Sequence, residues 1–168
     1  MTEPDTSLQP TTDLDGLFRA HYGRLVCALG LACGDVELAA DAVQEAFVRA
    51  HVRWRRIRHY EDPVGWIRRV AVNLLRDERR RSGRKRRAIE RLGGRAEAHV
   101  GPPKEPDQLD VLLCELPTQQ RTAVALYYVE GLDVGAVADA MQVAEGTVKS
   151  HLFDARRKLR AVIAPEAE

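Results

Sequence analysis

The chain contains two blocks of apolar residues with a helical period, separated by a stretch rich in glycine and proline. Within each block apolar residues recur at intervals of three and four, as on one face of an amphipathic helix, and we find no alternating pattern typical of a strand. The glycines and prolines between the blocks cannot sustain a long helix. The sequence therefore predicts an all-α protein of two small helical domains joined by a flexible linker.

The expected boundaries follow from composition. Residues 1–12 contain two prolines and several threonines without an apolar period, which indicates a flexible tail. The first domain is expected over 13–91, the linker over 92–106 and the second domain over 107–164.

Helix signals divide the first block into three helices. The first helix is expected to begin after Thr12 or Asp13, either of which could cap it, and to end at Gly30 and Gly34. The second helix runs from Asp35 to about Trp54. A third helix begins at Pro63, because proline suits a first helical turn, where its missing N–H needs no partner.

The second block predicts a helix-turn-helix. A helix from Thr118 ends at Gly131, and a short helix, a turn at 142–144 and a final helix follow. In this motif the final helix presents polar residues near its N-terminus to base edges in the major groove. The residues at these positions are Thr147, Lys149 and Ser150. Arg156 and Arg157 lie further along, where they either contact phosphates or form a solvated basic helix end.

The charge of the chain is unevenly distributed. The net charge is only +1, but basic residues crowd between Arg76 and Arg95, opposed there by Asp77, Glu78 and Glu90. A basic centre of this kind indicates a polyanionic partner.

Several classes of protein are not supported. The three cysteines, Cys27, Cys33 and Cys114, are odd in number and lack metal-ligand spacing, so we expect reduced, buried thiols in a cytoplasmic protein and no metal site. The N-terminus has acidic and polar residues where a signal peptide needs positive charge and an apolar run, so we expect no signal peptide. No apolar run approaches the ~18 residues of a membrane helix, so no membrane insertion is expected. The histidines are scattered without a nucleophile and its base, and no phosphate-binding glycine loop is present, so we expect neither an enzyme nor a cofactor.

Two further residue groups have a possible binding role. Asp41, Gln44 and Glu45 share one exposed helical face, although ordinary surface charge is the simpler explanation from these residues alone. The second group combines aromatic rings with guanidinium groups, which suit an unstacked nucleic-acid base, unless Trp66 and Tyr60 merely complete the core. Its members are Trp66, Arg69, Asn73, Arg76 and Arg80 on a helix, with Arg58, His59 and Tyr60 in the loop before it.

Three segments together resemble the extracytoplasmic-function branch of the sigma-70 family. They are AADAVQEAFVRAH (Ala39–His51), DPVGWIRRVAVNLLRDERRR (Asp62–Arg81) and the long segment Leu116–Arg160 that contains the helix-turn-helix. They stand in the family's order, with its linker between them.

The resemblance implies a sigma factor that binds core RNA polymerase and directs promoter-specific transcription initiation. The first domain is then sigma region 2, which docks on the polymerase through the Asp41, Gln44 and Glu45 face. Asn73 and the basic face around it would bind the minus-ten element, while the loop from Arg58 to Asp62 would capture a base flipped from the single-stranded non-template strand. The second domain is then region 4, which reads the duplex minus-thirty-five element through Thr147, Lys149, Ser150 and Phe153, with Arg156 and Arg157 near the phosphates. An anti-sigma factor is a further implied partner.

Two residues depart from the family pattern. Ala144 provides no side-chain oxygen to cap the recognition helix, and Asp154 places a negative charge where relatives often carry a basic residue. The main alternative is a stand-alone helix-turn-helix regulator of the response-regulator type, whose DNA-binding segment is similar to residues 130–152. Such proteins usually carry a separate sensing domain, and the first block has no α/β receiver pattern.

Overall fold

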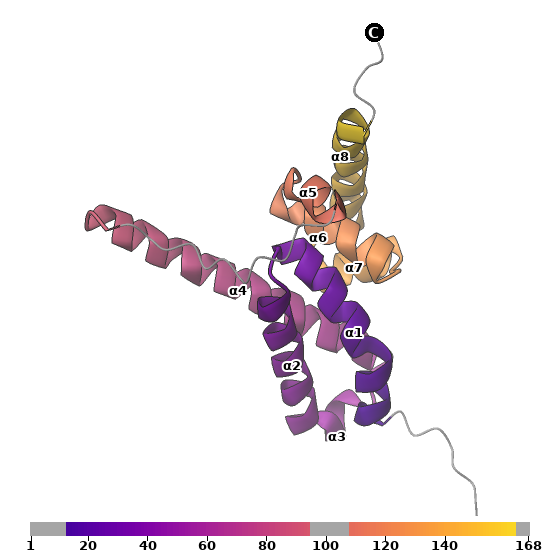
Figure 1. Ribbon diagram of the computed structural model, residues 1–168. Coiled ribbons are helices and arrows are strands. Elements are labelled where there is room, and N and C mark those ends of the chain that lie inside the picture. Colours follow the sequence, from indigo (N-terminus) through magenta and orange to yellow (C-terminus); the bar gives the residue numbers. More distant parts are fainter. Residues whose placement is uncertain (1–12, 95–107, 164–168) are drawn as a thin grey trace, which may run out of the picture.

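The computed structural model describes residues 13–94 and 108–163, and all the regular elements in these two ranges are helical (Figure 1). The predicted tail at 1–12 and most of the predicted linker lie outside the described residues. The all-α prediction is confirmed. Among the described helices, none combines the length and the apolar character needed to cross a membrane.

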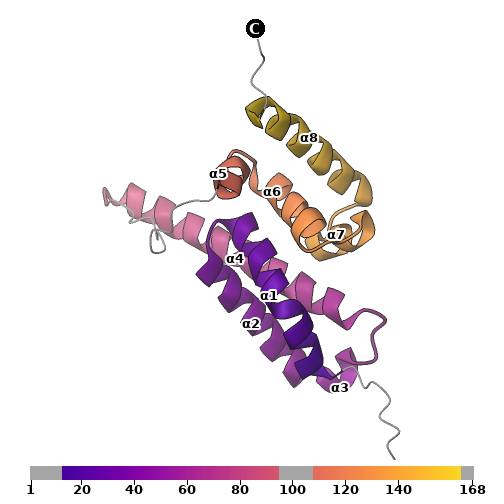
Figure 2. The same ribbon diagram turned by 45° about the vertical axis from the view of Figure 1, so that its right-hand side comes forward.

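Helices α1 (Leu14–Cys33) and α2 (Val36–Val52) form an antiparallel pair (Figure 2). Asp13 caps α1, and Gly34 ends it in a left-handed conformation, with φ of 76° and its N–H donating to the Gly30 carbonyl. The prediction that Gly30 also ends this helix is wrong, because Gly30 lies buried inside it. A Cβ at this position would stand 3.1 Å from a methyl of Val36, so glycine lets the start of α2 pack closely there.

A single turn, α3 (Trp54–Ile57), leads to the long helix α4 (Pro63–Arg91). Pro63 occupies the first turn as predicted, and the Asp62 carboxylate accepts a hydrogen bond from the Gly65 N–H at 2.8 Å. The first half of α4 packs against α2 and α1. Largest among the fully buried side chains of this bundle are Leu25, Leu29, Val43, Ile57 and Ile67.

The second block contains α5 (Gln108–Cys114), α6 (Thr118–Val124), a π-helical segment η1 (Ala125–Val129), α7 (Val134–Met141) and α8 (Glu145–Ile163). Helices α7 and α8 form the predicted helix-turn-helix. Gln142 ends α7 with φ of 56°, the left-handed turn that redirects the chain toward α8.

The two blocks pack against each other, which the sequence does not predict. Helix α1 contacts α6 and η1, while α4 contacts α7, and buried residues of both blocks form one continuous apolar cluster (Figures 1 and 2). The described arrangement is therefore a closed one, with the helix-turn-helix seated on the three-helix bundle.

The cysteine prediction needs a correction. Cys27 and Cys114 are exposed, and only Cys33 is partly buried. Both exposed thiols lie on the solvent-facing sides of their helices. All three are free thiols, and within the described residues no group of three His, Cys, Asp or Glu side chains could hold a metal ion.

Candidate nucleic-acid and polymerase interfaces

The predicted polymerase-binding residues form one exposed face on α2. Asp41, Gln44 and Glu45 are exposed and point away from the bundle, because the apolar residues next to them in the sequence, including Val43 and Phe47, fill its core. The Glu45 carboxylate pairs with Arg49 at 2.7 Å, and each side chain of that pair is 47% exposed. An ion pair this exposed contributes little to stability, so Glu45 can exchange it for a partner protein.

The predicted minus-ten residues lie in two different environments. Arg58, His59 and Tyr60 are exposed in the loop between α3 and α4, where the Arg58 Nε donates to the His59 ring at 3.2 Å. Trp66 is half-buried and packs against the apolar cluster, so it takes part in the core. Tyr60, by contrast, remains available on the surface.

Helix α7 covers the middle of the predicted minus-ten face. Arg69 and Asn73 are half-buried on this side of α4, and a guanidinium nitrogen of Arg76 donates to the Met141 carbonyl of α7 at 2.7 Å. Arg80, one helical turn further on, is exposed. The structure therefore leaves the two ends of this face open and occupies its centre with the helix-turn-helix.

A buried ion pair joins the two blocks beside that contact. Arg68 of α4 donates to the Glu130 carboxylate at 3.3 Å, and their side chains are only 7% and 2% exposed. The Nε of Arg68 and the second oxygen of Glu130 find no hydrogen-bond partner among the described residues. Incomplete pairing of two buried charges makes this contact a weak source of stability, and one sensitive to the loss of either partner.

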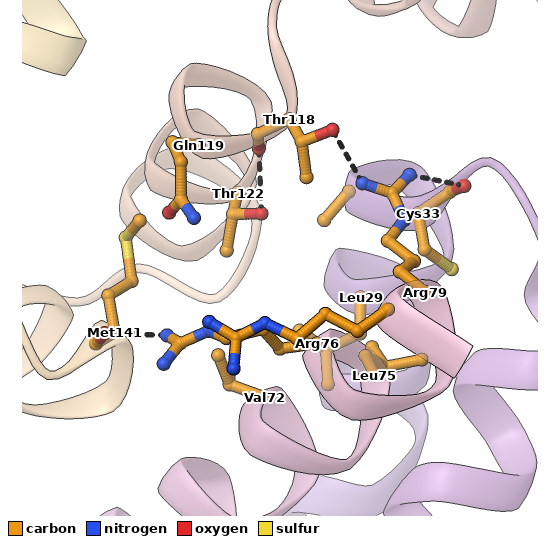
Figure 3. Close-up of a pocket in the computed structure, with 12 residues that line it drawn as sticks. Leu29, Cys33, Val72, Leu75, Arg76, Arg79, Thr118, Gln119, Thr122 and Met141 are labelled. Carbon is orange, nitrogen blue, oxygen red and sulfur yellow. Dashed lines mark hydrogen bonds between the residues drawn. The ribbon is translucent and has the colours of Figure 1, made fainter. Parts of the chain in front are cut away.

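A cavity of ≈ 290 Å³ lies next to the interface, between α1, α4, α6 and α7 (Figure 3). Its wall combines apolar side chains with the guanidinium of Arg79, which donates to the Thr118 hydroxyl at 2.6 Å and to the Cys33 carbonyl at 3.0 Å. Burial lowers the pKa of Arg79 and raises the pKa of the Cys33 thiol. Burial of this kind disfavours the thiolate, the form in which a cysteine is reactive.

The recognition helix α8 presents its predicted contacts to solvent. Thr147, Lys149 and Ser150 are exposed in its first turns, and Phe153 is 66% exposed one turn further on. Val148, Leu152 and Ala155 fill the core behind them. The helix therefore separates a buried stripe from an open polar face, as the sequence predicts.

Two tyrosines that no sequence motif identifies contact Arg156, one of the residues that we predict to lie near DNA phosphates. Tyr127 and Tyr128 follow one another on η1, and the guanidinium of Arg156 lies 5.9 Å and 5.6 Å from their ring centres. The Arg156 Nε donates to the Tyr128 hydroxyl at 2.7 Å. This bond uses one of the five N–H donors of the guanidinium and leaves the others for an acceptor outside the chain.

Asp154 and Ala144 show how the departures from the family pattern are accommodated. The Asp154 carboxylate lies 3.5 Å from a guanidinium nitrogen of Arg157 on the next turn of α8. Ala144 has no side-chain oxygen to cap the start of α8. Its backbone carbonyl accepts hydrogen bonds from the N–H groups of Thr147 and Val148. The carboxylate of Asp154 therefore partly neutralises the charge of Arg157, which we predict to lie near DNA phosphates.

Comparison with known families agrees with this division of the chain. The model of Sigma-70 region 2 matches residues 17–85, and the model of Sigma-70, region 4 matches residues 107–159. Two solved structures show the same fold. The sigma factor RpoE from Bartonella quintana, in complex with the anti-sigma factor NepR, has a TM-score of 0.75 and 20% identity, and the match covers 93% of this chain and 99% of RpoE. CnrH, in complex with the cytosolic domain of CnrY, has a TM-score of 0.60 and 24% identity, with coverages of 92% and 89%.

Comparison with individual proteins identifies the branch of the family to which the chain belongs. The ECF RNA polymerase sigma factor SigM of Mycobacterium tuberculosis H37Rv is 31% identical, over 89% of this chain and 76% of the relative. SigM of Bacillus subtilis is also 31% identical, over 89% of this chain and 94% of that protein. SigE of Mycolicibacterium smegmatis is 30% identical, and the chain spans 61% of its length. The chain belongs to the sigma-70 family, as a member of its extracytoplasmic-function branch.

Proposed function

We propose that this protein binds bacterial core RNA polymerase and directs it to promoters, whose minus-ten and minus-thirty-five elements it recognises. The observation that carries the proposal is that regions 2 and 4 of one family stand in order on one chain. The α2 face and the α8 face, to which we assign polymerase and duplex DNA, are both exposed. A sigma factor acts where the polymerase acts, so we assign the protein to the cytoplasm and assign it no enzymatic role.

The closed arrangement adds a condition to this function. Arg76 hydrogen-bonds to the Met141 carbonyl of α7, so the centre of the minus-ten face is not free to meet DNA. We propose that α7 must leave α4 before this face is used. An anti-sigma factor that holds the two domains together would fit that requirement, and both solved relatives named above are complexes with such a factor or with a second protein's cytosolic domain.

Transcription from a library of genomic fragments tests the proposal. Core polymerase with the protein should initiate from a small set of fragments that share two short sequence elements at a fixed spacing, while core polymerase alone should not. Initiation at the same sites with and without the protein would reject the proposal. The response-regulator alternative is not favoured, because it leaves the region 2 match unexplained. It predicts DNA binding that needs no polymerase.

Replacing Lys149 and Ser150 by alanine should weaken recognition of the minus-thirty-five element. Both side chains are exposed in the first turns of α8, where side chains reach base edges. A good pairing of a side chain with a base edge is worth about 1–3 kcal/mol, so we expect the loss of two contacts to lower holoenzyme affinity for the selected promoter at least about tenfold. Binding to core polymerase should not change, because the α2 face is untouched. Equal losses of both activities would show that the domain roles are wrongly assigned.

Tyr128→Phe should lower promoter affinity by about three- to tenfold, because it removes the hydrogen bond that orients Arg156. The ring contacts remain in this variant, so the fold should be unaffected. The same change in an Arg156→Ala background should have no further effect, since the group that Tyr128 orients is then absent. Tyr127→Phe is the matched control. Equal effects of Tyr128→Phe in both backgrounds would show that Tyr128 acts on something other than Arg156.

A further inference from the structure

The second half of α4 extends beyond the bundle as an exposed arm (Figures 1 and 2). The last buried side chain of this helix is Leu75, yet the helix continues to Arg91. Residues after Arg81 therefore contribute no fully buried apolar side chain. A helix of this length without a packing face needs another reason to exist, and its basic composition suggests one.

The arginines of the arm lie on one stripe. Residues separated by three and four positions share a helical face, and such spacings lead from Arg80 to Arg84, Arg87 and Arg91. All of these side chains are exposed. At 1.5 Å per residue, this part of the stripe is about 17 Å long.

The same stripe begins inside the proposed minus-ten face. Going back from Arg80 by the same spacings gives Arg76, Asn73 and Arg69. The line from Arg69 to Arg91 is about 33 Å long, close to one turn of B-form DNA, and only Asn73 on it is not an arginine. The arm therefore continues a surface to which we have already assigned DNA.

Other charged side chains of the arm point elsewhere and are partly neutralised. Arg81 pairs with Glu78 at 3.2 Å, and Arg86 pairs with Glu90 at 3.7 Å, along faces away from the stripe. Arg84, Arg87 and Arg91 form no such ion pair with the residues that the structure describes. The stripe is thus the side of the arm with the least compensated positive charge.

We infer that Arg84, Arg87 and Arg91, which continue the line of arginines beyond Arg80, bind the phosphate backbone of duplex DNA immediately upstream of the minus-ten element. The inference rests on the proposed function. The resemblance to the family assigns the unpaired base to the loop at the N-terminal end of α4, so we place the far end of the helix on DNA that is still paired. Because the arm is exposed in the closed arrangement, it can make this contact before α7 leaves α4.

Two matched variants test the arm. Arg84→Gln, Arg87→Gln and Arg91→Gln together remove three charges from the stripe. Arg81→Gln, Lys85→Gln and Arg86→Gln remove three charges from the other faces of the same segment. Glutamine is a good helix former, and none of these side chains is buried, so both variants should fold. Each is assembled with core polymerase and titrated with a promoter duplex recovered from the library at several salt concentrations.

The stripe variant should bind at least about tenfold more weakly at moderate salt. It should also lower the slope of log affinity against log salt by about 0.9 for each phosphate that the protein no longer neutralises, up to about 2.7. The control variant should change both quantities much less. A duplex with uncharged methylphosphonate linkages just upstream of the minus-ten element should bind the stripe variant and the original protein equally.

Equal losses of affinity in the two variants would overturn the inference, and so would an unchanged affinity of the stripe variant. The inference would also fail if the stripe variant bound the methylphosphonate duplex as much more weakly than the original protein as it binds the ordinary duplex. In these cases promoter-specific transcription by the original protein would leave the proposed function intact. Absence of promoter-specific transcription by the original protein would overturn both.

Discussion

Replacing Asp41, Gln44 and Glu45 together by alanine will lower the affinity of the protein for core RNA polymerase by at least about a hundredfold. Hydrogen bonds to charged groups are worth about 1.5–3 kcal/mol each, and a loss of about 2.7 kcal/mol or more corresponds to about two orders of magnitude. Alanine favours the helix and the residues are exposed, so α2 should keep its structure. Titration of a fluorescently labelled protein with core polymerase measures the change.

The control for this prediction removes two negative charges from other helices. Asp15 and Asp77 are exposed on α1 and α4, so their replacement by alanine changes the net charge equally without altering the α2 face. We expect the control protein to bind core polymerase with nearly unchanged affinity. Equal weakening of both proteins would mean that net charge, and not the α2 face, governs the interaction.

Glu130→Ala should open the closed arrangement. The substitution leaves the guanidinium of Arg68 buried without its partner, which costs about 3–5 kcal/mol. Separation of the two blocks relieves this cost, because Arg68 is then hydrated. A bias of this size changes the ratio of closed to open protein by more than about a hundredfold. Small-angle X-ray scattering should report a larger radius of gyration, with helix content by circular dichroism unchanged.

A double substitution separates loss of the interface from loss of charge. Arg68→Met with Glu130→Met replaces the buried pair by apolar side chains, an exchange that is often neutral or stabilising. We therefore expect this variant to remain compact, and to bind single-stranded minus-ten DNA less well than Glu130→Ala. A Glu130→Ala protein as compact as the original would show that the pair does not hold the blocks together. A double variant as expanded as Glu130→Ala would show instead that the ion pair itself holds the blocks together, and that an unpaired buried charge is not needed to open them.

Local signals in the sequence are sufficient to predict most of the helices. Asp13, Asp35 and Pro63 stand at helix starts, and Gly34 and Gly131 have the positive φ values of chain reversals. These features depend on neighbours within a few residues, which the sequence displays directly. The prediction that Gly30 ends α1 is wrong, because the missing side chain at Gly30 makes room for Val36 of the next helix. Such a contact between helices leaves no pattern in the neighbouring sequence.

The packing of the two blocks could not be predicted for the same reason. Arg68 and Glu130 are separated by 62 positions, and Arg68 is one of many arginines in α4, so nothing in the sequence indicates that these two residues meet in the interior. The exposed faces of α2 and α8 were easier to predict, because the apolar period that fills the core also identifies the side chains left outside. The centre of the α4 face was assigned to DNA, but here it meets α7, so its role in DNA binding stays a prediction.

Gel filtration of the protein with bacterial core RNA polymerase tests the central claim most directly. We expect a single complex that contains both components and that, once isolated, initiates transcription at the promoters recovered from the genomic library. A protein that elutes apart from the polymerase, yet binds DNA by itself, would contradict the sigma-factor function and favour a stand-alone regulator.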